Sequence, residues 1–185
     1  MSNRKSPNIM IEKISLDRVG DLHEALLESS KEWFEEEMIP TPDLSMDELE
    51  YATRELLDLW EKDEFYTFHI LEVSTQQVLG FAFLNHVNRQ YQMANLGYSV
   101  RTSRAGEGIA TEAAKLVARY GFEQLGLHRI EIIARPQNVA SLRVAEKLGA
   151  VREGLLRNRV QHHGAPCDVY MHSLIPSDFG IRTTA

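Results

Sequence analysis

Two glycines stand where an extended segment meets a helical one, and this junction is well suited to hold an anion. Residues 95–100 are strand-like, and after Gly108 the small residues Ala110, Ala113 and Val117 share one helical face. Glycine lets a backbone approach a ligand closely, and the N–H groups at a helix start attract anions. The pattern predicts a pyrophosphate-binding loop at residues 105–111. The alternative interpretation is a tight strand-to-helix turn.

Two well-known phosphate loops do not match this junction. The P-loop requires Gly-Lys-Ser/Thr, whereas Gly108 is followed by Ile109 and Ala110. The dinucleotide fingerprint requires a small residue where Thr111 stands. It also requires an acidic residue at the end of the next strand, whereas Glu131 lies inside its predicted strand. The P-loop is therefore excluded, and the dinucleotide fingerprint is a near miss.

A second signature lies downstream of the loop. Residues 129–134 are strand-like, and the helix that follows has a natural N-cap at Asn138 and a natural C-terminal glycine at Gly149. Both signatures together resemble the GNAT N-acetyltransferase superfamily. The matching pattern is Ala105-x-x-Gly108-x-Ala110, then a strand, Asn138, a helix and Lys147-Leu148-Gly149.

Further motifs make the chain most similar to the Rim-type branch of that superfamily, which acetylates protein N-termini. These motifs are Asn95-Leu96-Gly97-Tyr98, Asn138-x-x-Ser141, and the ending Glu153-Gly154, Gly164 and Asp168-Val169-Tyr170-Met171. The resemblance covers residues 9–175. It implies a mixed α/β fold, with a mostly antiparallel central sheet that splays near the cofactor site and about four flanking helices.

The resemblance implies acetyl-CoA as co-substrate and no metal. The backbone of Tyr98, Ser99 and Val100 is expected to hold the pantetheine arm, while loop N–H groups hold the pyrophosphate and two arginines add positive charge. Ala105 replaces the usual Gln or Arg of the family, and Arg104 is expected to compensate. The expected cofactor contacts are Tyr98, Ser99, Val100, Arg101, Arg104, Ala105, Gly106, Glu107, Gly108, Ile109, Ala110, Thr111, Asn138 and Ser141.

Acetyl transfer also needs a proton for the departing thiolate. Many GNAT members supply it from a Tyr, and Ala145 stands at that position here. Ser141 lies one helical turn earlier on the same face, where Rim-type enzymes use a serine. Ser141 is therefore the expected general acid. Its alternative role is a second capping hydroxyl for the helix.

A general base is harder to find. Related enzymes often place a Glu where Asn95 stands, and Rim-type members can carry another near Arg159, Val160 and Gln161. Asn95 is expected to hold a water or the acceptor amine, and His86 is the nearest titrating candidate for the base. A partly buried sheet histidine is the alternative interpretation of His86.

The lack of a strong general base affects which acceptor amine is expected. An α-amine has a pKa of about 7.7–8.0, whereas a lysine near 10.4 is about 0.1% neutral at cellular pH. We therefore expect a protein N-terminal α-amine, of the ribosomal-protein type. The alternatives are a polyamine or aminoglycoside-like amine, and a non-catalytic acyl-CoA-binding module. The acidic stretch from Lys31 to Glu50 fits either a cationic acceptor or a solvated helix face.

Two other groups of residues suggest chemistry less strongly. His162, His163, Cys167 and Asp168 surround a hairpin turn at Gly164, and adjacent strand residues point to opposite faces, so no metal site is expected. Trp33 and Phe34 are expected at the edge of the core.

The elements that position these residues follow from periodicity and punctuation. Strands are expected at 9–14, 66–73, 78–87, 93–101, 129–134, 151–160 and 169–174. Helices are expected at 16–33, 45–62, 108–124 and 138–148, the second with a Ser45–Glu48 capping box. Residues 9–175 form one domain in this prediction, between a disordered start (1–8) and a tail (176–185).

Composition fits a small enzyme of one domain. The chain has 185 residues, is 43% hydrophobic and carries a net charge of −7, which argues against direct nucleic-acid binding. It has no apolar run of about 20 residues, so no membrane span is expected. The single Cys167 and the absence of an apolar leader predict a cytoplasmic protein. A monomer and a homodimer both remain open.

Overall fold

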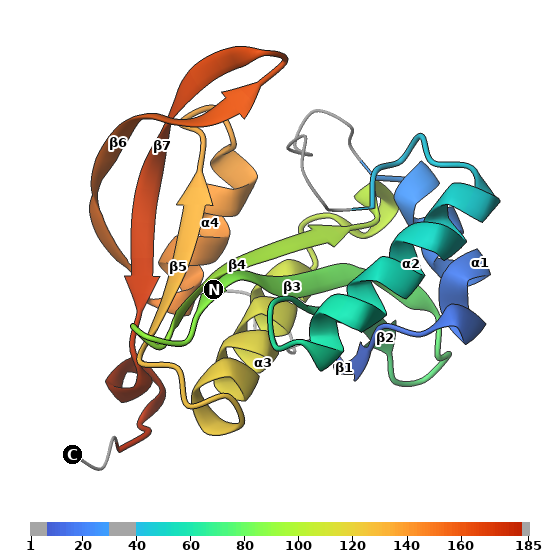
Figure 1. Ribbon diagram of the computed structural model, residues 1–185, viewed down its shortest axis with the longest axis horizontal. Coiled ribbons are helices and arrows are strands. Elements are labelled where there is room, and N and C mark those ends of the chain that lie inside the picture. Colours follow the sequence, from blue (N-terminus) through green and yellow to red (C-terminus); the bar gives the residue numbers. More distant parts are fainter. Residues whose placement is uncertain (1–6, 30–39, 183–185) are drawn as a thin grey trace.

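A seven-stranded sheet forms the middle layer of the molecule (Figure 1). The computed structural model describes residues 7–29 and 40–182. Its strands are β1 (Ile9–Lys13), β2 (Tyr66–Glu72), β3 (Val78–Asn88), β4 (Met93–Val100), β5 (Arg129–Ala134), β6 (Val151–His162) and β7 (Ala165–Leu174). The α-helices in the described ranges are α1 (Val19–Leu27), α2 (Met46–Glu61), α3 (Ile109–Glu123) and α4 (Val139–Leu148).

The strand order is β1-β2-β3-β4-β5-β7-β6, and all neighbours are antiparallel except β4 and β5, which are parallel. Parallel neighbours need a crossover connection, and α3 supplies it. The mixed α/β fold with a mostly antiparallel sheet, predicted from the sequence, is confirmed.

Both faces of β3 are buried, which explains why this strand is almost continuously apolar. Phe81 and Phe83 point into the core under α1 and α2, whereas Ala82 and Leu84 point into the core under α3. Because successive strand side chains alternate in direction, one strand serves both layers. The two cores thus pack against both faces of the sheet at β3, the strand beside β4.

Predicted helix ends are confirmed at three positions. The Ser45 Oγ accepts a hydrogen bond from the Glu48 backbone N–H, and the Glu48 carboxylate accepts one from the Ser45 N–H at 2.8 Å. Asn138 Oδ1 accepts from the Ser141 N–H at 3.0 Å, at the start of α4. Gly149 ends α4 with a φ of 78°, a left-handed conformation that favours glycine.

Several boundaries differ from the prediction. The helix expected from Leu16 begins as a 3-10 turn (Leu16–Arg18), and α1 itself ends at Leu27. Trp33 and Phe34 lie outside the described residues. The hairpin strands β6 and β7 reach closer to the turn than expected, because His163 and Gly164 both adopt positive φ and close a tight two-residue turn.

Ordered structure is also present at both ends of the described chain. The Asn8 carbonyl accepts a hydrogen bond from the Val73 N–H at 3.0 Å, next to β1. After β7, Pro176–Phe179 forms a 3-10 helix, and the Phe179 ring lies 5.3 Å from that of Phe122 on α3. The chain beyond residue 175 therefore contributes to the packing of α3.

Candidate active site

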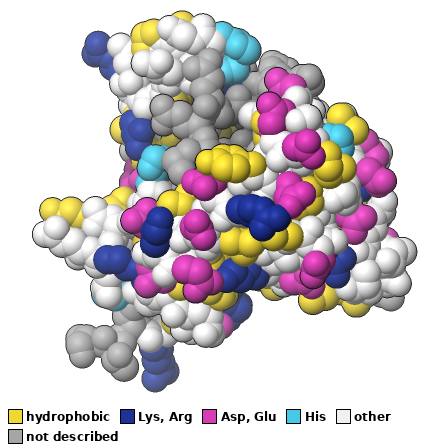
Figure 2. All heavy atoms as spheres, turned by 45° about the vertical axis from the view of Figure 1, so that its right-hand side comes forward, with side chains coloured by type: hydrophobic (Ala, Val, Ile, Leu, Met, Phe, Trp, Pro, Cys, Tyr) yellow, Lys and Arg dark blue, Asp and Glu magenta, His cyan; other side chains and the backbone are white. Residues whose placement is uncertain are grey.

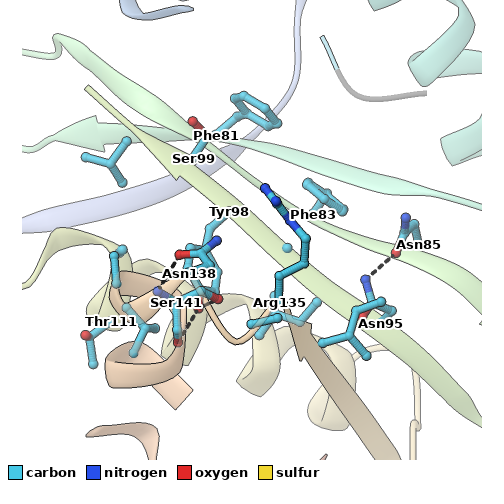
Figure 3. Close-up of a pocket in the computed structure, with 18 of the residues that line it drawn as sticks. Phe81, Phe83, Asn85, Asn95, Tyr98, Ser99, Thr111, Arg135, Asn138 and Ser141 are labelled. Carbon is cyan, nitrogen blue, oxygen red and sulfur yellow. Dashed lines mark hydrogen bonds between the residues drawn. The ribbon is translucent and has the colours of Figure 1, made fainter. Parts of the chain in front are cut away.

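A cavity of about 1040 Å³ opens where β4 and β5 diverge (Figure 3). The two strands pair only from Met93 to Asn95 on β4, so Leu96–Val100 has no neighbouring strand on that side. The splay expected near the cofactor site is therefore present. An extended ligand can hydrogen-bond to such an open strand edge much as another strand would. Tyr98, Ser99 and Val100, the expected pantetheine contacts, line the cavity along this edge.

The loop after β4 leaves the start of α3 open. Gly106 and Gly108 have φ values of 81° and 87°, a region that favours glycine. Gly108 caps α3 without a side chain, and the Glu112 N–H makes the bond to the Gly108 carbonyl at 3.0 Å. A Cβ on Gly108 would meet nothing nearer than Pro7, at 3.8 Å. The space in front of this helix end can therefore hold an anion.

Most of the remaining loop residues line the cavity, and others do not. The predicted cofactor contacts that line the cavity here are Arg104, Ala105, Gly106, Gly108, Ile109, Ala110 and Thr111. Arg104 lies between two carboxylates, with its Nη2 3.0 Å from Glu72 and 2.9 Å from Glu107, which raise the pKa of its guanidinium. The Glu107 side chain pairs with Arg104 and does not line the cavity, and the contact expected of Glu107, through its backbone N–H, stays a prediction.

Arg101 does not lie where the sequence analysis expected it. Its guanidinium is buried, with Nη1 2.6 Å from Glu28 and Nε donating to the Val78 carbonyl at 2.8 Å. The side chain thus ties the end of β4 to α1 and to β3. It does not line the cavity, and its charge is paired with Glu28.

Arg135 is a lining residue that sequence reasoning missed. It follows the last residue of β5, is only 8% exposed, and extends from β5 toward β4 across the cavity (Figure 3). The signal for it is a basic residue directly after a strand whose neighbour diverges. Among the described lining residues, one carboxylate, Glu64, accompanies five cations, Arg104, Arg135, Arg143, Lys147 and Arg159, of which Arg104 is paired with Glu72 and Glu107 outside the lining. The described wall is therefore suited to an anionic ligand.

Ser141 and Asn138 reach the cavity from the first turn of α4. Asn138 fixes this turn by accepting from the Ser141 N–H. The Ser141 hydroxyl lies 3.0 Å from the Tyr98 hydroxyl on β4 (Figure 3). The Asn138 amide oxygen thus caps α4, whereas the Ser141 hydroxyl contacts the Tyr98 hydroxyl.

Tyr98 was predicted only as a backbone contact. Its side chain crosses from β4 to α4, and burial raises the pKa of its phenol to about 12. The phenol therefore stays protonated across the physiological range. The position of Tyr98 on the α3 and α4 face of β4 could be inferred from strand alternation, but its partner on α4 could not.

Asn95 lies at the point where β4 and β5 begin to separate. Its Nδ2 donates to the Asn85 Oδ1 at 2.8 Å, which pairs two amides across β3 and β4 (Figure 3). Its Oδ1 is buried and has no hydrogen-bond partner among the described residues. A buried unsatisfied acceptor is costly. It is therefore a candidate to receive a hydrogen bond from a bound ligand or water.

His86 also lines the cavity, next to Asn85. Its φ is 51°, and the register of β3 and β4 shifts between Asn85 and Asn88. Such a bulge redirects side chains at the end of a strand. The side chain is exposed, so it differs from the partly buried sheet histidine of the alternative interpretation. Arg159, Val160 and Gln161 of β6 lie on the same cavity wall.

The acidic stretch is only partly described. Glu32, Glu35, Glu36 and Glu37 lie outside the described residues, and Asp43, Asp47, Glu48 and Glu50 are not among the cavity-lining residues. On the face that carries α1 and α2, acidic side chains lie among basic and apolar ones (Figure 2). The described half of the stretch therefore matches a solvated helix face.

The histidine-rich hairpin contains no evident metal site. The rings of His162 and His163 lie 4.0 Å apart, and Asp168 accepts a hydrogen bond from the Asn158 N–H at 2.8 Å. No group of three His, Cys, Asp or Glu in the described ranges could hold a metal ion. Across residues 7–29 and 40–182, no helix is both long and apolar enough to cross a membrane.

Comparison with known proteins identifies the class to which this fold and site belong. The family model described as an acetyltransferase (GNAT) domain matches residues 8–151. The chain belongs to the GNAT acetyltransferase family. Members of this family use acetyl-CoA, which fits the splayed strands and the open end of α3.

Two relatives illustrate that some names state an acceptor and others do not. The chain is 42% identical over 105 residues to "Probable N-acetyltransferase YjcK" of Bacillus subtilis, covering 56% of this chain and 58% of that protein. It is 30% identical over 105 residues to the spermidine N(1)-acetyltransferase of Escherichia coli, covering 55% and 56%. The matches thus span little more than half the length of these relatives.

Solved structures share the fold over most of the chain. A structure from Vibrio cholerae, described as "a putative ribosomal-protein-serine acetyltransferase", has a TM-score of 0.76 at 29% identity, covering 94% of this chain and 97% of that one. RimJ of Mycobacterium smegmatis, in complex with CoA-disulfide, has a TM-score of 0.83 at 22% identity, covering 92% and 83%.

Proposed function

We propose that the protein transfers the acetyl group of acetyl-CoA to the α-amine of a protein N-terminus, of the ribosomal-protein type. The observation that carries this proposal is the neutral Asn85–Asn95 pair, with its unpartnered Asn95 Oδ1, where a base is expected. A neutral amide accepts a hydrogen bond from an amine that is already unprotonated. It cannot take a proton from a strongly basic one.

The chemistry follows from this arrangement. The loop and the start of α3 hold the pyrophosphate, and the open edge of β4 holds the pantetheine arm, so that the thioester lies between the diverging strands. The amine, positioned by Asn95, attacks the thioester carbonyl. Ser141 then gives a proton to the departing sulfur. Thiols have a pKa of about 8.5, so this leaving group needs only modest assistance.

The basic wall supports an acceptor with a single, weakly basic amine. Arg135 and Arg159 lie in the same cavity as the Asn85–Asn95 pair. Positive charge nearby lowers the pKa of a bound amine, which favours its reactive neutral form. The same charge opposes a polyamine, whose several ammonium groups would be repelled.

A polyamine acceptor is the second candidate. The similarity to the spermidine N(1)-acetyltransferase of Escherichia coli favours it, as does the acidic composition of residues 32–37. A non-catalytic acyl-CoA-binding module is the third, since Asn95 and Ala105 stand where related enzymes carry a Glu and a Gln or Arg.

Release of free CoA thiol, measured with a panel of acceptors, separates the three. The panel contains a peptide with a free N-terminus, the same peptide with a blocked N-terminus and an internal lysine, and spermidine. We expect the free peptide to give the highest kcat/KM and the blocked peptide to give almost no turnover. A preference for spermidine would select the second candidate, and tight CoA binding without turnover on any amine would select the third.

A further inference from the structure

Two hydroxyl groups meet at the wall of the cavity. The Tyr98 Oη lies 3.0 Å from the Ser141 Oγ and 3.4 Å from the Ser141 carbonyl oxygen. In these contacts the phenol can donate to two oxygens, and both of them belong to Ser141. The Ser141 N–H is already engaged by Asn138, which fixes the serine backbone.

The direction of the hydroxyl contact determines what Ser141 can do. If the serine donates to the phenol, its only proton is used within the pair. If the phenol donates to the serine, the serine proton is free to point into the cavity. A phenol is the more acidic of the two hydroxyls and the weaker acceptor, which favours donation from Tyr98. A donated hydrogen bond also polarises the serine and strengthens it as a donor.

We propose that Tyr98 is a positioning residue for acetyl transfer, because its hydroxyl donates to the Ser141 Oγ and directs the serine proton toward the departing sulfur. This inference rests on the proposed acid role of Ser141. In the step itself, the bond from the amine nitrogen to the carbonyl carbon forms and the carbon–sulfur bond breaks. The electron pair goes to sulfur, which takes the serine proton. The proton lost by the amine returns to Ser141 through water.

Tyr98 keeps its proton throughout this step. Its environment supports that role, because burial raises the pKa of the phenol to about 12 and so keeps it protonated at neutral pH. The ring packs against the core under α3, so the hydroxyl is held in place by the sheet.

A double-mutant cycle tests the inference. Tyr98→Phe keeps the ring and removes the hydroxyl, and we expect kcat to fall about tenfold with little change in CoA affinity or in KM for acetyl-CoA. Adding Tyr98→Phe to Ser141→Ala should lower kcat no further, because both changes act on the same proton. Tyr120→Phe is the matched control, since Tyr120 lies against Trp60 and Phe68 away from the cavity, and it should leave kcat unchanged.

Three results would overturn the inference. If kcat is unchanged in Tyr98→Phe, the hydroxyl has no role in turnover. If the two separate losses of kcat multiply in the double variant, Tyr98 acts on a different step from Ser141. A loss in Tyr98→Phe beside an unaffected Ser141→Ala would make the phenol the direct donor, and would separately refute the proposed role of Ser141.

A fluorinated tyrosine at position 98 covers the case in which Tyr98→Phe fails to fold. It keeps the hydroxyl and nearly the same shape, but its phenol is a stronger donor. We expect kcat at neutral pH to rise, because the donation to Ser141 strengthens. An unchanged or reduced kcat in the folded protein would contradict the inference.

Discussion

Ser141 carries the proposed acid chemistry, and its removal separates catalysis from stability. Ser141→Ala is expected to lower kcat about 100-fold, the low end of general acid catalysis, with little effect on CoA affinity. Stability should change little, because Asn138 supplies the recorded side-chain cap of α4. Steady-state kinetics and thermal unfolding of the same variant measure both quantities. Intact kcat beside a lowered melting temperature would return Ser141 to a capping role.

Asn95 offers a test of acceptor choice. Asn95→Asp places a carboxylate where related enzymes carry a base, so the site could then deprotonate a strongly basic amine. We expect the kcat/KM for spermidine, relative to that for the free N-terminal peptide, to increase about tenfold. Asn88→Asp is the control, since Asn88 only accepts from the Tyr91 N–H in the β3–β4 turn. An unchanged ratio in Asn95→Asp would argue against base strength as the basis of selectivity.

Residue types and spacing identified part of this site and missed another part. The structure brings Ser141, Asn138, Asn95 and His86, all selected from the sequence, to one cavity, and their roles stay predictions. Arg101 was misplaced because its partner, Glu28, directly follows α1, far away in the sequence. Motifs read along one segment cannot reveal such a contact. The contact between Tyr98 and Ser141 is of the same kind.

At the scale of elements, the junction of β4 and α3 is the proposed cofactor site. Gly108→Val is expected to abolish stabilisation by acetyl-CoA, because the side chain would occupy the approach to the helix end. In the unmodified protein, ligand at one hundred times its Kd should add about 2.7 kcal/mol, with or without a metal chelator.

Gly126→Val is the matched control for this change. Gly126 also has a positive φ, 66°, and open space around it, but it lies beyond the far end of α3. Both variants should lose similar stability in the absence of ligand, and only Gly108→Val should lose the thermal shift with acetyl-CoA. A normal shift in Gly108→Val would contradict the assignment of this loop.

The pairing of β1 and β2 contains a buried histidine that links stability to pH. Burial lowers the pKa of His69 from 6.5 to about 4, and its Nε2 accepts from the Ser15 N–H at 3.1 Å. Above pH 6.5 the ring is neutral in both the folded and the unfolded protein, so the histidine makes its full contribution to the free energy of unfolding. As the pH falls below 6.5 the unfolded chain binds the proton first, so stability decreases until about pH 4.

The expected loss over this range is about 3 kcal/mol. His69→Gln keeps an acceptor for the Ser15 N–H but does not titrate, so its free energy of unfolding should fall less steeply with acid. Denaturant unfolding at a series of pH values compares the two slopes. Equal slopes would show that His69 is not the group responsible.

Element boundaries were largely predictable because local signals set them. Asn138 and Gly149 mark the two ends of α4 in the sequence, and the structure confirms both. The extent of the splay was not predictable from residues alone, because it depends on where the pairing of β4 with β5 stops. The resemblance to the GNAT family supplied that expectation.

At the scale of the whole molecule, a chain of net charge −7 surrounds a cavity in whose described lining basic side chains outnumber acidic ones. This contrast matches an anionic cofactor and a singly charged, weakly basic acceptor. It also defines the central claim, that the acetyl group goes to an α-amine rather than to a side-chain amine or a polyamine.

The most direct test is to locate the acetyl group on a peptide that carries both a free N-terminus and an internal lysine. The peptide is incubated with the protein and acetyl-CoA in the presence of equimolar spermidine, and fragment masses identify the modified nitrogen. We predict acetyl on the N-terminal nitrogen, with lysine and spermidine essentially unmodified. Acetyl found mainly on spermidine or on the lysine side chain would contradict the account.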